Sequence, residues 1–111
     1  MTEDQLHDMN QYETRLRNAL NGLRIRGWDS FQILQLLRTV ILDNLENLNI
    51  QDLPLEVRER IAETTEQVVT AAADVIDIPY IIEPFESRLE NFIIEVLMKW
   101  LYRVLDLPQQ S

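Results

Sequence analysis

The sequence predicts an all-α protein, a small antiparallel four-helix bundle in which residues 1–111 form a single helical domain. Apolar residues recur at spacings of three and four along most of the chain, which is the period of an amphipathic helix. Glycine occurs only twice, and the four prolines lie between the helical segments or after the last one. A chain of 111 residues is also long enough to bury a core of its own.

The first predicted helix covers residues 3–26 and buries one apolar stripe. Thr2 is placed to cap its start, and Gly27 can end it in a left-handed conformation. Gly22 weakens the last turn, which leaves an earlier end open. The stripe consists of Leu6, Met9, Tyr12, Leu16, Ala19, Leu20 and Leu23.

The second predicted helix covers residues 30–48 and is apolar around most of its circumference. We therefore expect it in the middle of the bundle, in contact with more than one neighbour. The third predicted helix covers residues 54–76 and starts at Pro54, which suits a first helical turn. Its apolar seam is narrow and its back is charged, so we expect it to be an outer helix.

The connection at residues 77–84 is unusually apolar for a loop. It carries Ile81 and Ile82 between Pro79 and Pro84, and the prolines prevent a helix from continuing through it. The segment can serve as a lid that folds over the end of the bundle, or as an apolar contact strip for a partner. We favour the lid, because isoleucines exposed to water are costly and usually find cover.

The last predicted helix covers residues 84–107 and is more apolar than an outer helix requires. At about 100° per residue its apolar side chains sweep an arc of roughly 200°, whereas the surface helix of a monomer needs only about 100°. The excess has to contact several neighbours, another chain or a membrane surface. The arc consists of Leu89, Ile93, Val96, Leu97, Trp100, Leu101, Val104 and Leu105.

The core is expected where the apolar faces of the four helices meet. Truncating its aliphatic residues should cost about 2–5 kcal/mol each. The predicted core consists of Leu34, Leu37, Ile41, Ile61, Val68, Ile93, Leu97 and Val104.

The charge pattern argues against nucleic acid as a direct ligand. The chain has 19 acidic and 10 basic residues and a net charge of −9, so its surface as a whole repels nucleic acid and anionic lipid. Basic residues gather between Arg15 and Arg26, whereas residues 43–95 are mainly acidic. We favour solvated helix faces over an electrostatic docking surface as the explanation of this asymmetry.

No residue pattern indicates catalysis, a metal or a cofactor. The chain has no cysteine, and His7 is its only histidine, so a zinc site or a di-iron site lacks ligands. There is no glycine-rich phosphate loop and no serine in a nucleophile elbow. The carboxylates are numerous but lie among arginines and polar residues, which favours solvated faces over acid–base chemistry.

The sequence therefore predicts a non-enzymatic protein-interaction module, an adaptor, assembly or regulatory protein that uses its apolar last helix. We expect a soluble cytoplasmic homo-oligomer, most simply a dimer, because a two-fold contact lets one apolar patch cover itself. Two alternatives remain open: a small acidic decoy from a mobile element that blocks a basic surface, and a peripheral membrane protein. The predicted interface consists of Ile81, Ile82, Phe92, Met98, Leu101, Tyr102 and Leu105.

Overall fold

The computed structural model describes residues 2–21, 30–73 and 85–108. In these ranges the chain is helical and contains no strand, as the sequence predicts. The four α-helices are α1 (Glu3–Asn21), α2 (Ser30–Leu45), α3 (Leu55–Ala73) and α4 (Phe85–Val104), and a short 3₁₀-helix, η1 (Ile50–Asp52), precedes α3.

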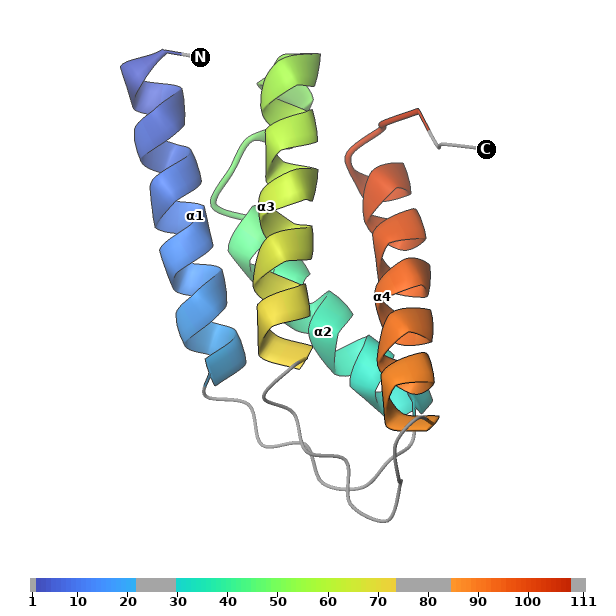
Figure 1. Cartoon of the computed structure of the whole chain (residues 1–111). Coiled ribbons are helices and arrows are strands. Elements are labelled where there is room, and N and C mark those ends of the chain that lie inside the picture. The colour runs from blue at the N-terminus through green and yellow to red at the C-terminus, as the bar shows by residue number, and fades with distance from the viewer. Residues whose placement is uncertain (1, 22–29, 74–84, 109–111) are drawn as a thin grey trace.

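The helices pack in an order that differs from their order in the sequence. Figure 1 shows α1, α3 and α4 side by side, with α2 crossing behind them. The main contacts are those of α1 with α3 and α2, and those of α4 with α3 and α2. Consecutive helices run in opposite directions in Figure 1, so α1 and α3, which make the most extensive contact, run in the same direction.

The start of α1 is capped as the sequence predicts. The hydroxyl oxygen of Thr2 accepts a hydrogen bond from the Gln5 backbone N–H at 3.1 Å, and the Gln5 side-chain oxygen accepts one from the Thr2 N–H at 3.0 Å. This reciprocal pair is a capping box, which satisfies two backbone donors at once. The helix reaches Asn21, and the remainder of the predicted segment lies outside the described residues.

The end of α2 differs slightly from the predicted boundary, whereas α3 is entered at Pro54 as predicted, and residues 74–76 of its predicted range lie outside the described residues. The α-helical geometry of α2 ends at Leu45, three residues before the predicted end, and a turn follows. The connection to α3 contains η1, since the Leu53 N–H bonds to the Ile50 carbonyl at 3.1 Å. The Pro54 carbonyl then accepts the N–H of Arg58 at 3.1 Å, which makes Pro54 the entry to α3.

The C-terminus of α4 ends in a Schellman motif. Asp106 has a positive φ of 53°, the Leu107 N–H bonds to the Tyr102 carbonyl at 2.8 Å, and the Asp106 N–H bonds to the Arg103 carbonyl at 3.2 Å. Arg58 on α3 completes the cap, because its Nη1 donates to the carbonyls of Leu105 and Asp106, both at 2.9 Å. These bonds fix the start of α3 against the end of α4.

The core forms largely as predicted. Six of the eight expected core residues are buried, but the expectation is wrong for Leu34 and Val104, which are only half-buried at the edge of the core. The expected stripe of α1 is buried at its centre, whereas Leu6 near the first turn is 49% exposed. The six confirmed residues are Leu37, Ile41, Ile61, Val68, Ile93 and Leu97.

The third helix keeps the exposed charged back that the sequence predicts, but its buried face is wider than the apolar seam. Its buried face includes the small residues Ala62, Thr64 and Thr65 beside the apolar seam, and small side chains allow α1 to pack closely. Thr65 donates its hydroxyl hydrogen to the Ile61 carbonyl at 2.7 Å. Because a hydroxyl has one hydrogen, Tyr12 on α1 donates to the Thr65 hydroxyl, at 2.6 Å. The expected outer helix is therefore held to α1 by a buried hydrogen bond.

Candidate interaction groove between α3 and α4

The apolar side chains of α4 are divided among three surroundings. A core row, Ile93, Leu97 and Leu101, is buried in the bundle. On one side, half-buried Trp100 faces α2, where the Arg38 guanidinium lies 5.5 Å from the centre of its ring. This distance suits a cation–π contact. The bundle itself thus accounts for much of the arc.

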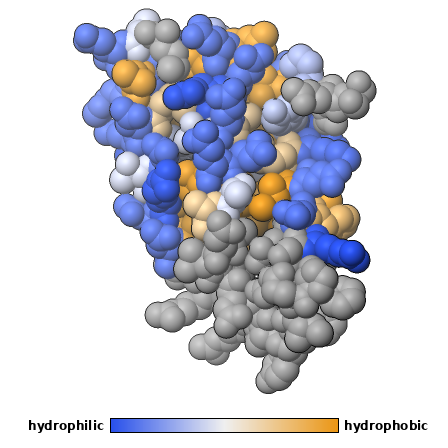
Figure 2. Space-filling view, in the orientation of Figure 1, coloured by the Kyte–Doolittle hydropathy of each residue, from blue (hydrophilic) through white to orange (hydrophobic). Residues whose placement is uncertain are grey.

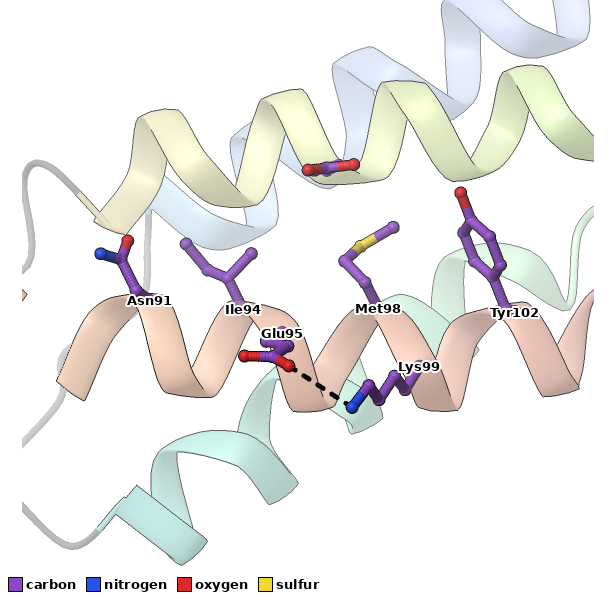
Figure 3. Close-up of a pocket in the computed structure, with 7 residues that line it drawn as sticks. Asn91, Ile94, Glu95, Met98, Lys99 and Tyr102 are labelled. Atoms are coloured by element: carbon purple, nitrogen blue, oxygen red, sulfur yellow. Dashed lines mark ion pairs between the residues drawn. The ribbon is translucent and has the colours of Figure 1, made fainter. Parts of the chain in front are cut away.

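Next to the arc, on the side of α4 that faces α3, further side chains form a groove. The groove row, Ile94, Met98 and Tyr102, is half-buried and points toward α3 together with Asn91 (Figure 3). The three side chains are spaced by four residues, so they follow one another along the same face of α4. Together with Glu66 of α3 they line an open groove of about 330 Å³.

The rim of the groove is charged. On the α4 side, Lys99 Nζ lies 3.4 Å from Glu95 Oε1 (Figure 3). On the α3 side, Glu66 has no hydrogen-bond or ion-pair partner among the described residues. The groove therefore has an apolar floor, an ion pair within its rim on α4 and, on α3, an acid that no other described residue engages.

A second hollow lies directly beside the groove on α3. It has a volume of about 510 Å³ and shares Glu66 with the groove. Its other lining residues are Glu63, Gln67, Thr70 and Ala71. Glu63 is paired with Arg60 at 3.5 Å, and both side chains are exposed. In Figure 2 the surface over these helices is mostly hydrophilic, and apolar colour shows between α3 and α4.

The structure corrects two of the predicted interface residues. Leu101 and Leu105 are fully buried within the single chain, so neither can contact a second copy without unfolding the end of α4. The helical spacing places them beside Met98 and Tyr102, but their side chains turn toward the core rather than the groove. Ile81 and Ile82 lie outside the described residues.

The remaining predicted interface residues are at the surface or at its edge. Met98 and Tyr102 belong to the groove row. Phe92 is 57% exposed, the most exposed of the large apolar side chains described, and it lies outside the set that lines the groove. The predicted interface thus includes two residues that line the groove, but it does not separate them from the core row or from Phe92.

Sequence reasoning missed Ile94, Asn91 and Glu66 as parts of this surface. Ile94 could have been found, because it precedes Met98 and Tyr102 at the same four-residue spacing. Glu66 could not, since nothing in the sequence says that its turn of α3 lies opposite the middle of α4. That pairing depends on the packing order of the helices.

The candidates for chemistry remain at the surface. His7 is exposed, and its Nε2 lies 3.0 Å from the Gln11 side-chain nitrogen. In residues 2–21, 30–73 and 85–108, no three histidine or carboxylate side chains are grouped so that they could hold a metal ion. None of the described helices has the length and apolarity needed to cross a membrane.

No protein-family model matches the chain, and no curated protein or solved structure shows significant similarity to it.

Proposed function

We propose that the protein is a non-enzymatic interaction module that binds another polypeptide in the groove between α3 and α4. The groove row carries this proposal: three apolar side chains in successive turns of α4 stay half-exposed, although the bundle covers the core row beside them. An apolar strip with a charged rim is the usual composition of a protein-binding surface. Met98 adds a flexible side chain that can adapt to the occupant.

The groove replaces the broader contact that the sequence predicts. The sequence argument for a homodimer rests on the whole apolar arc, and two of its residues, Leu101 and Leu105, lie inside the core. What remains for a partner is the groove row, with Phe92 as a separate exposed ring. The acidic-decoy alternative gains no support from this surface, since a phosphate mimic would keep one face purely acidic, and Lys99 lines the groove beside Glu95.

Site-specific photo-crosslinking tests the proposal. We would replace Tyr102 with benzoylphenylalanine and irradiate the protein in its native host, with Phe92 replaced in the same way as the control. Both positions are aromatic and lie on α4, but only Tyr102 lines the groove. We expect a discrete crosslinked protein from position 102 and none from position 92.

Crosslinking from position 92 alone would move the contact to the outer face of α4 and contradict the groove. Absence of any crosslinked protein at both positions would contradict the interaction module itself. A crosslink between two copies of the chain from position 102 would identify the occupant as a second copy.

A further inference from the structure

The shape of the groove restricts what can fill it. The row Ile94, Met98 and Tyr102 spans nine residues of α4, and its first and last residues lie eight steps of 1.5 Å apart, about 12 Å along the helix axis. This strip is narrow and straight, because all three side chains lie on one face of one helix. An amphipathic helix presents apolar side chains every three or four residues, which matches such a strip.

The charge at the groove restricts the occupant further. Glu66 is exposed and has no partner among the described residues, while Glu63 and Glu95 are each engaged with a base on their own helix. An occupant lying over the groove row approaches Glu66 from the α4 side. A basic side chain at that point gains an ion pair, whereas an acidic one is repelled.

A second copy of the chain is poorly suited to place a basic side chain beside Glu66. Each copy carries a net charge of −9, so two copies repel one another. Four of its nine arginines are also engaged within the chain: Arg17 pairs with Glu13, Arg38 lies over Trp100, Arg58 caps α4 and Arg60 pairs with Glu63. Arg15, Arg88 and Arg103 are exposed and have no partner among the described residues, so it is the net charge that disfavours a second copy. The charge complementarity favours a different, basic chain.

We infer that the groove takes a basic amphipathic helix of another protein, with its apolar side on Ile94, Met98 and Tyr102 and a lysine or arginine beside Glu66. This inference rests on the proposed function and names its partner class. It predicts that a negative side chain at position 66 favours a basic helix and that a positive side chain there favours an acidic helix.

Two designed peptides of 18 residues test this inference by fluorescence anisotropy. Both carry leucines at the same helical spacing, and their polar positions are all lysine in one and all glutamate in the other. The protein is used unmutated, as Glu66→Lys, and as Asp43→Lys, which makes the same change in net charge on α2. We expect Glu66→Lys to weaken the lysine peptide by about tenfold or more and to strengthen the glutamate peptide. Asp43→Lys should change both affinities much less.

The other possible outcomes distinguish a failure of the inference from a failure of the proposed function. Equal effects of Glu66→Lys and Asp43→Lys would show that only net charge matters, which overturns the inference. No binding of either peptide, with crosslinking still seen from position 102, would overturn the basic helix and leave the interaction module standing. A dimer that Met98→Asp converts to monomer in sedimentation, while circular dichroism shows the fold retained, would make a second copy the occupant and also overturn the inference.

Discussion

At the scale of single residues, the hydrogen bond between Tyr12 and Thr65 joins two buried hydroxyl groups that differ in their other partners. Both side chains are buried, yet each hydroxyl has a partner. Thr65 serves as donor to its own helix and as acceptor from α1. The Tyr12 hydroxyl therefore needs Thr65 as its acceptor, whereas the Thr65 hydroxyl keeps its bond to Ile61 without Tyr12. Substitutions at the two positions should lower the free energy of unfolding by different amounts.

Thr65→Val should destabilise the protein more than Tyr12→Phe. Removing the Thr65 hydroxyl leaves the buried Tyr12 hydroxyl without its acceptor, which costs about 1–3 kcal/mol. Tyr12→Phe leaves the Thr65 donor still bonded to Ile61, so about 0.5–1.5 kcal/mol is expected. Urea unfolding of both variants and of the double variant measures this. A double variant no less stable than Thr65→Val fits the account, and one whose losses simply add contradicts it.

The buried phenol of Tyr12 should also lower the free energy of unfolding in alkaline solution. Burial raises the pKa of Tyr12 from 10.0 to about 12. Between these two values the unfolded chain releases the phenol proton while the folded chain keeps it, so the free energy of unfolding falls as the pH rises. The fall should be about 3 kcal/mol at most, from 1.36 kcal/mol per pKa unit. Unfolding curves at pH 9 to 12 should show it, and an equal fall in Tyr12→Phe would assign it to other groups.

At the scale of helices, sequence patterning succeeded for the existence and type of each element. The period of apolar residues, the Thr2 cap and the prolines between segments were sufficient, because these signals are local. The width of the buried face of α3 was not predicted, since small residues such as Ala62 and Thr65 add little to an apolar pattern. The sequence prediction places the end of the last helix at residue 107, whereas α4 ends at Val104. The stop was not recognised because Asp106 adopts the left-handed conformation that glycine usually takes.

The cap that α3 places on α4 should be costly to remove. Arg58→Ala takes away the donor to two carbonyls that have no partner within the helix, and we expect a loss of about 1–3 kcal/mol. Arg60→Ala is the matched control, since its exposed ion pair with Glu63 should contribute less than about 1 kcal/mol. Thermal unfolding of the two variants compares them. Similar losses would show that the Arg58 contacts add nothing beyond a surface pair.

Substitutions at Leu101 and Met98 test whether Leu101 belongs to the core row and Met98 to the groove row. Leu101→Glu places a charge in the core at a fully buried position, and we expect a loss of about 4 kcal/mol or more. Met98→Glu, at a half-buried position in the groove, should cost less. Denaturant unfolding monitored by circular dichroism measures both losses. A folded Leu101→Glu protein with only a lowered mass would restore Leu101 to an interface between copies.

At the scale of the whole molecule, the packing order explains how much of the site was accessible from the sequence. The sequence predicts an apolar surface on the last helix and includes Met98 and Tyr102 in it. It cannot divide that surface, because the division depends on which helices flank α4. With α3 on one side and α2 on the other, the apolar surface of α4 separates into a core row, a groove row and the Trp100 contact. What the sequence presents as one large patch becomes a groove of about 330 Å³.

The most direct test of the account is to map where a helix binds, through amide chemical shifts of the isotope-labelled protein during titration with the lysine peptide. We predict that the shifts change mainly along residues 63–71 of α3 and 91–102 of α4, and that α1 remains unchanged. Changes centred on α1 or α2 at saturating peptide would contradict the proposal that the groove between α3 and α4 is the binding surface.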